Sequence, residues 1–150
     1  MALVIKKSRI PGAGKGLFTT KFIPKGKKII EYRGEIIKWK EYLKRVKEEK
    51  DGYLFFIRRD KCIDAYNTPQ YKARYANDAR GLIRIPGLKN NAQYEIHDDR
   101  CFIVATRDIQ PGEEILVDYT KEYWDAIRYN IRKGLYKKKK IMSSPKKKKK

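Results

Sequence analysis

The apolar residues of this chain lie in short runs separated by turn residues, and this arrangement limits the fold. Branched and aromatic residues, which are typical of β-strands, dominate the runs. Glycine, proline, asparagine and aspartate interrupt the sequence between them. We predict strands over residues 3–5, 28–32, 53–57, 62–65, 94–96, 101–106 and 115–119, the fourth and fifth separated by a longer loop. The predicted fold class is mainly β, of the α+β type, with several short sheets and few helices.

One segment has helical periodicity instead. Between residues 36 and 50 the apolar residues recur at spacings of three and four, which predicts one amphipathic helix ended by Asp51-Gly52. A second, short helix is predicted over residues 122–132. Turns are predicted at residues 22–26 and 97–100, and an exposed loop around Pro86-Gly87 and Asn90-Asn91.

The chain carries a large positive charge that is unevenly distributed. The formal net charge is +20, and nine lysines lie in residues 137–150 (Lys137 to Lys140 and Lys146 to Lys150), so residues 1–136 carry the remaining +11. We predict one domain over residues 1–136 and a disordered lysine-rich tail over residues 137–150. This charge favours salt-sensitive binding to polyanions, with the tail as a candidate nucleic-acid tether.

Cysteine count and hydropathy exclude several classes of protein. Cys62 and Cys101 are too few for a disulfide framework or a structural zinc site, so we predict buried thiols and no metal. No apolar run approaches the roughly 18 residues of a membrane span, and no secretory signal is apparent. We therefore expect a soluble intracellular protein, either cytoplasmic or associated with a nucleus or nucleoid.

Three glycines lie close together in Gly12-Ala13-Gly14-Lys15-Gly16, which Leu17-Phe18 follows. Glycines permit a tight turn, and they also let the backbone approach a ligand closely. The segment lacks the lysine–serine ending of a P-loop and the spacing of a dinucleotide-binding fingerprint. Taken alone, it favours an ordinary hairpin turn.

Two later segments change this interpretation. The first is Arg74-Tyr75-Ala76-Asn77-Asp78-Ala79, and the second is Gly112-Glu113-Glu114-Ile115-Leu116-Val117-Asp118-Tyr119. Each has a plain structural alternative, a polar turn for the first and a turn into an edge strand for the second. Together with the glycine segment and Tyr32-Arg33-Gly34-Glu35, and in this order, they resemble the signatures of the SET-domain protein-lysine methyltransferases. Those signatures are G-x-G-L/V/I-F/W, Y-x-G-E, R-F-I/A-N-H-S and G-E-E-L/I-x-x-D-Y.

The resemblance covers roughly residues 8–124 and implies a SET-domain fold with a C-terminal pseudoknot. It also implies S-adenosylmethionine (SAM) as cofactor, with Asn77 bonding its α-amino group and Arg74 orienting nearby carbonyls. The implied cofactor-binding residues are Lys15, Gly16, Leu17, Arg74, Asn77, Asp78, Tyr119 and Trp124. At Asp78 the chain departs from the family, which has histidine there. We interpret this change as tolerated if that position acts through its backbone.

The resemblance assigns Tyr119 the catalytic position. A lysine amine with a pKa near 10.4 is only about a thousandth neutral at pH 7, so burial beside a positive sulfonium would help to deprotonate it. A positioned phenol oxygen would then align amine, methyl and sulfur without a strong base. Tyr32, Tyr53 and Val117 are the candidates for the walls of the substrate channel.

We expect the substrate to be a lysine in a histone or other basic nucleic-acid-associated protein. A homodimer is one way to complete the groove that flanking modules form in larger relatives. Two alternatives stay open: a basic nucleic-acid-binding module, and a SET-like module that binds SAM without turnover. Asp78 is the main support for the second alternative.

Overall fold

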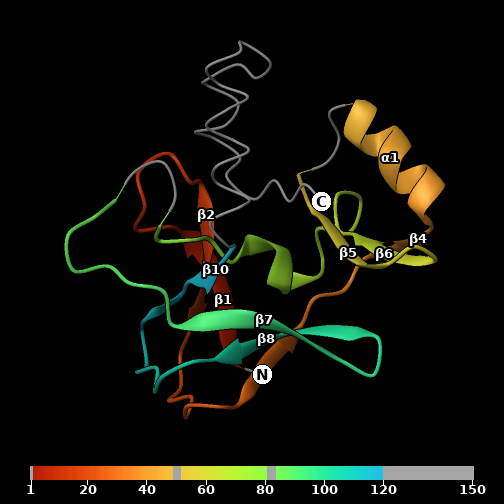
Figure 1. The fold of residues 1–150 in the computed structure, drawn as a ribbon. Coiled ribbons are helices and arrows are strands. Elements are labelled where there is room, and N and C mark those ends of the chain that lie inside the picture. Colours follow the sequence, from red (N-terminus) through yellow and green to blue (C-terminus); the bar gives the residue numbers. More distant parts are fainter. Residues whose placement is uncertain (1, 49–51, 81–83, 120–150) are drawn as a thin grey trace.

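The computed structural model describes residues 2–48, 52–80 and 84–119. These residues form short strands, one α-helix and one short 3-10 helix, as Figure 1 shows. The helices are α1 (Trp39–Lys47) and η1 (Lys72–Tyr75). The strands are β1 (Leu3–Lys7), β2 (Lys15–Thr19), β3 (Lys28–Glu31), β4 (Glu35–Ile37), β5 (Leu54–Arg58), β6 (Lys61–Asp64), β7 (Ala92–His97), β8 (Arg100–Ala105), β9 (Glu114–Ile115) and β10 (Val117–Asp118). The predicted mainly β fold class is confirmed.

The described strands form three small sheets. Their strand orders are β1-β2-β9, β10-β7-β8-β3 and β4-β6-β5. Neighbouring strands are antiparallel except β7 and β10, which pair in parallel with Val117 opposite Ala92. In Figure 1, α1 and the sheet of β4, β5 and β6 lie at one end of the molecule, away from β1 and β2. One hydrophobic cluster joins the sheets and includes Leu17 of β2, Ile63 of β6 and Ile103 of β8.

The chain between β9 and β10 passes between two distant segments. Leu116 forms a parallel bridge with Asn77, and the Val117 amide donates a 2.8 Å hydrogen bond to the Asn77 carbonyl. On the other side, the amides of Asn91 and Ala92 both donate to the Leu116 carbonyl. The last strand is thus held between residue 77 and residues 91–92, which is the crossing expected of the pseudoknot.

The predicted helix over residues 36–50 is too long at its start. Ile36 lies in β4, where it pairs with Ile63 of β6, and the helix begins only at Trp39. Pairing with β6 outweighs the helical spacing because the branched Ile36 and Ile37 suit a strand. Within α1, Tyr42 is fully buried, whereas Leu43 is 47% exposed although the pattern placed it on the apolar face. The predicted end at Asp51 lies outside the described residues.

One strand prediction and one loop prediction need correction, and one turn is confirmed. The predicted strand 115–119 is divided at Leu116 into β9 and β10, which belong to different sheets. Asn91 was predicted in an exposed loop, but it is buried because its side chain bonds two backbone groups of the crossing strand. The β7–β8 hairpin turns at Asp98 and Asp99, both with positive φ, as predicted.

Two further expectations can be compared with the described residues. Cys62 and Cys101 are both buried and free, as expected. In the described part of the chain, no helix is long and apolar enough to cross a membrane. The predicted helix over residues 122–132 and the lysine-rich tail lie outside the described residues.

Candidate active site

Asn77 is the point at which three of the four sequence signatures meet. Its side-chain amide donates to the Lys15 carbonyl at 3.1 Å and to Oε2 of Glu114 at 3.4 Å. Its own carbonyl accepts the Val117 amide. The glycine segment, the asparagine motif and the terminal motif are distant in sequence, yet they converge on this one buried residue.

Glu114 fixes the glycine segment against this junction. Its buried carboxylate accepts hydrogen bonds from Ser8 Oγ at 2.7 Å and from the Arg9 amide at 3.0 Å. A Cβ at position 16 would overlap with the Glu114 carboxylate, so glycine lets the two segments approach this closely. In the sequence, Glu114 stands within the terminal motif, but nothing near it shows its contacts with Ser8 and Arg9.

Tyr119 is held at both ends by residues 76–78. Its amide donates to Oδ2 of Asp78 at 2.9 Å, and its hydroxyl donates to the Ala76 carbonyl at 2.6 Å. The side chain is 3% exposed. The residue predicted to be catalytic is therefore fixed in position and lies beside the asparagine motif.

An aromatic cluster extends from Tyr119 into the core. The ring of Tyr94 stacks against Tyr119 with centroids 6.3 Å apart, and Tyr94 also contacts Phe55 at 5.1 Å and Tyr32 at 6.0 Å. The Tyr32 hydroxyl donates to the Tyr53 carbonyl at 2.9 Å. Ring contacts with Tyr94 thus connect Tyr32 to Tyr119. Neither Tyr94 nor Phe55 was predicted from the sequence as a site residue.

Burial raises the pKa of Tyr32 and of Tyr94 well above the usual value of 10.0. The neighbouring acidic groups act in the same direction, including Asp64 at Tyr32 and Asp78 at Tyr94. Both phenols therefore stay protonated at neutral pH.

Arg74 lies at the edge of this cluster. Its guanidinium donates to the carbonyls of Ala65 at 2.8 Å and Tyr66 at 3.0 Å, and it lies over the Tyr53 ring at 4.3 Å. It orients carbonyls, the action predicted for it, and its Nε is buried without a hydrogen-bond partner among the described residues. Val117, predicted to line the channel, is fully buried in the main cluster.

The remaining predicted residues divide into two groups. Lys15, Gly16 and Leu17 begin β2, with Leu17 buried in the core and Lys15 exposed at its side chain. Their backbone lies beside Asn77 through the Lys15 carbonyl. Trp124 lies outside the described residues. In the described part of the chain, no group of His, Cys, Asp and Glu side chains could hold a metal ion.

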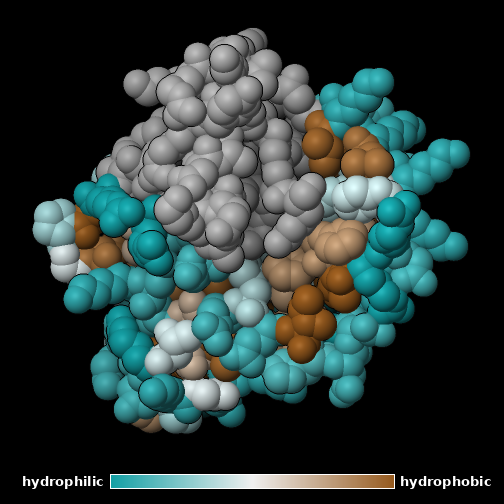
Figure 2. Space-filling view, in the orientation of Figure 1, coloured by the Kyte–Doolittle hydropathy of each residue, from teal (hydrophilic) through white to brown (hydrophobic). Residues whose placement is uncertain are grey.

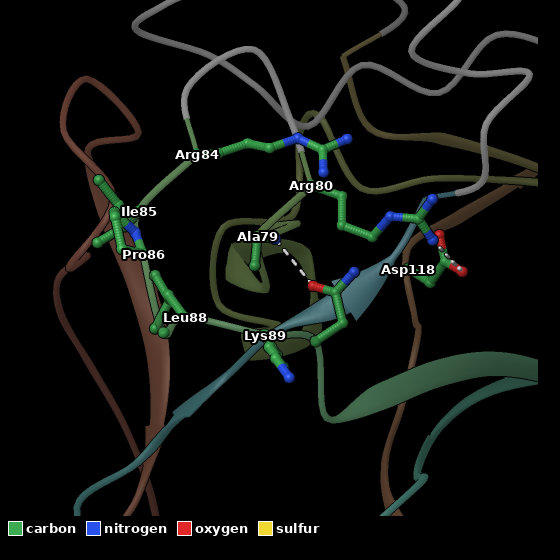
Figure 3. A pocket seen from close by; sticks show the side chains of 10 residues that line it. Ala79, Arg80, Arg84, Ile85, Pro86, Leu88, Lys89 and Asp118 are labelled. Atoms are coloured by element: carbon green, nitrogen blue, oxygen red, sulfur yellow. Dashed lines mark hydrogen bonds and ion pairs between the residues drawn. The ribbon is translucent and has the colours of Figure 1, made fainter.

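A cavity of about 610 Å³ adjoins the junction (Figure 3). Ala79 and Asp118 line it, and they are the chain neighbours of Asp78 and Tyr119. The Asn90 side chain accepts the Ala79 amide at 2.8 Å, and Arg80 points toward Asp118 across the opening. Of the described residues that were predicted to bind cofactor, none lines the cavity.

Comparison with known proteins identifies several relatives. N-lysine methyltransferase KMT5A-A from Danio rerio is 29% identical over 122 residues, which are 73% of this chain and 33% of the relative. Histone-lysine N-methyltransferase set-1 from Caenorhabditis elegans is 30% identical over 126 residues, 78% of this chain and 50% of the relative. Histone-lysine N-methyltransferase EZH2 from Chaetomium thermophilum is 32% identical over 128 residues, 79% and 8% respectively. The chain thus spans half or less of the length of these relatives.

Solved structures and a family model agree with these relatives. A Chaetomium thermophilum Polycomb Repressive Complex 2, a humanized mutant bound to the inhibitor GSK126, matches with a TM-score of 0.63 and 31% identity. The match covers 79% of this chain and 15% of that one. The family model described as SET domain matches residues 14–120, which include all three motifs that meet at Asn77. The chain therefore belongs to the SET-domain family.

Proposed function

We propose that this chain is a SAM-dependent protein-lysine N-methyltransferase whose substrate is a histone or another basic, nucleic-acid-associated protein. The observation that carries the proposal is the convergence of the three signatures on Asn77, with Tyr119 held beside it. Family membership and relatives named as lysine methyltransferases support the reaction class.

The residues around Asn77 fit a cofactor with an α-amino group. The Asn77 amide nitrogen donates to the Lys15 carbonyl and to Glu114, so the side chain is fixed at the position where the resemblance places the α-amino group of the cofactor. The backbone of Lys15 to Leu17, together with Arg74, Asn77 and Asp78, would hold SAM, and Trp124 would complete the site. When bound, SAM supplies the activated methyl group.

The chain's own residues would position and desolvate the lysine. The rings of Tyr32, Tyr94 and Tyr119 form one cluster that excludes water from the lysine side chain, and burial favours its neutral amine. The Tyr119 oxygen, fixed by the Ala76 carbonyl, would align the amine for in-line attack. No histidine takes part, since His97 lies at an exposed hairpin end beside Glu95.

The test is incubation of the full chain with tritium-labelled SAM and core histones, bacterial nucleoid proteins, ribosomal proteins or no added substrate. We expect label on lysine in at least one basic protein, and calorimetry should show one binding site for SAM. Absence of SAM binding would contradict the proposal. Binding without label on any substrate would favour the SET-like module without turnover.

A second candidate function, binding to nucleic acid, has its own support. In residues 2–48, 52–80 and 84–119, every ion pair uses an arginine or His97, and no lysine takes part. The lysines of these residues thus stay outside the ion pairs, and the face drawn in Figure 2 is largely hydrophilic. Such lysines attract phosphate backbones, as would the tail Lys137 to Lys150.

Salt-dependent binding to duplex DNA would test this second function. The full chain is compared with a chain that lacks residues 137–150 at several salt concentrations. If the affinity for DNA depends less steeply on salt concentration after the deletion, tethering by the tail is supported. If the dependence is equal in the two chains, the DNA contacts are made by residues 1–136. Nuclear or nucleoid association and a homodimer are proposals of the same kind, to be tested by fractionation and by sedimentation.

A further inference from the structure

The Asp78 carboxylate joins three separate parts of the chain. Its Oδ1 accepts the Arg80 amide and the Asn90 side-chain amide, both at 2.8 Å, and its Oδ2 accepts the Tyr119 amide at 2.9 Å. The residue is 4% exposed. Three N–H donors thus converge on one buried carboxylate, an arrangement that only an acceptor-only side chain can satisfy.

Of these hydrogen bonds, the one from the Tyr119 amide lies just past the point where the strand pairing of β10 ends. β10 pairs with β7 only at Val117 and Asp118, so the next amide, that of Tyr119, has left the ladder. Asp78 accepts that amide two residues from Ala76, whose carbonyl accepts the Tyr119 hydroxyl. The backbone amide and the side-chain hydroxyl of Tyr119 are therefore both hydrogen-bonded to the segment of residues 76–78.

Asn90 braces the carboxylate. Its Nδ2 donates to Asp78, and its Oδ1 accepts the Ala79 amide at 2.8 Å, so the Asn90 side chain bonds two consecutive residues (Figure 3 shows the Ala79 bond). The next residue, Asn91, bonds the Glu114 carbonyl and the Leu116 amide. A continuous polar chain therefore runs from Asp78 through residues 90–91 to the strand that carries Tyr119.

We propose that the Asp78 side chain is a positioning residue for Tyr119, and that the departure from the family's histidine is a working part of this site. The inference rests on the proposed function, in which the Tyr119 oxygen aligns the amine. A neutral imidazole has one acceptor nitrogen and an imidazolium has none, so histidine cannot accept the same three donors. Restoring the family residue should therefore lower activity.

The experiment compares Asp78→Asn and Asp78→His with Asp108→Asn as matched control. Asp108 also accepts a backbone amide, that of Lys25 at 2.8 Å, but on an exposed turn. We expect Asp78→Asn and Asp78→His to lower kcat by roughly tenfold or more, because small misplacements of an aligning group are costly. The dissociation constant for SAM should change by less than about threefold, since the backbone contacts remain. Asp108→Asn should match the wild type.

NMR spectroscopy can detect the hydrogen bond between Asp78 and the Tyr119 amide without enzymatic turnover. In protein labelled with 15N-tyrosine, the Tyr119 amide is identified by its loss in Tyr119→Phe, and its proton should shift in Asp78→Asn but not in Asp108→Asn. If Asp78→Asn does not fold, Asn90→Ala removes the brace and should lower kcat to a smaller extent.

Three outcomes would overturn the inference alone: an unchanged kcat in Asp78→Asn, a loss of kcat that only follows lost SAM affinity, or an unmoved Tyr119 amide. A wild-type chain that transfers no methyl group would instead remove the proposed function, and the inference with it.

Discussion

Glu114 occupies the space that a side chain at Gly16 would need. The carboxylate is buried and accepts hydrogen bonds from two residues that precede the glycine segment, through the Ser8 hydroxyl and the Arg9 amide. A residue from the end of the domain thereby determines how closely its first hairpin approaches Asn77. This contact makes the glycine a packing requirement of the junction as well as a turn residue.

Gly16→Ala should therefore destabilise the fold by about 1–3 kcal/mol, as overpacking of a buried site does. The added methyl group must displace Glu114, which is also a partner of Asn77. Urea unfolding measures the change, with Lys15→Ala, at the exposed neighbouring side chain, as the control. Equal stability of the two variants would show that Glu114 yields easily.

Tyr119→Phe should keep SAM binding and lose at least about 100-fold in kcat, because the aligning oxygen is removed. It should also lose about 1–2 kcal/mol of stability, since the buried Ala76 carbonyl loses its donor. Single-turnover methyl transfer and thermal unfolding measure the two effects. Tyr75→Phe is the control, since that hydroxyl donates to Pro69 from an exposed position. Full activity of Tyr119→Phe would refute the role given to Tyr119.

Arg45→Met should cost about 2–3 kcal/mol of stability. Arg45 of α1 bonds Glu35, Glu41 and Asp64, and the Asp64 carboxylate, at 2.7 Å, is almost fully buried. Loss of the guanidinium leaves that carboxylate without its charge partner. Chemical denaturation measures the loss. Arg58→Met, which removes a pair of exposed bridges to Asp60 and Asp99, should leave stability nearly unchanged.

The Arg45 hydrogen bonds lower the pKa of Glu35 from its usual value of 4.5. Because the native pKa lies below the unfolded one, the contribution is present above about pH 4.5 and is lost as the pH falls through the native pKa. Glu35→Gln should thus have a lower Tm than the wild type at pH 6, and the two should converge toward pH 3. Glu48→Gln, at an exposed site past α1, controls for loss of one charge. A constant difference across this range would contradict the assignment.

Local sequence pattern was sufficient for most strands and insufficient where distant segments meet. The β7–β8 hairpin followed from turn residues between apolar runs. The strand position of Ile36 could not be predicted in this way. Its spacing from Tyr42 and Leu43 is a local signal that indicates a helix, whereas its pairing with Ile63 depends on a residue distant in sequence. Asn91 looked like loop chemistry because nothing near it in sequence shows that Glu114 and Leu116 supply its partners.

In the candidate site, too, residues within contiguous motifs were found from the sequence, and contacts between distant segments were not. Tyr119 and Asn77 were found through motifs, because each motif is contiguous in sequence. Tyr94 was missed because strand alternation predicts only that a β7 residue faces inward, and does not predict that it stacks on Tyr119. Asp78 was found through its motif. Only the fold shows that its side chain, and not the backbone alone, reaches Tyr119.

The crossing of residues 114–119 between residue 77 and residues 91–92 has a kinetic consequence. Its contacts join segments far apart in the chain, and such contacts form late and slowly during folding. A ribosome must therefore release nearly the whole domain before Asn77, Lys15 and Tyr119 can meet. A truncated or partly synthesised chain without residues 114–119 would therefore lack the junction that brings these residues together.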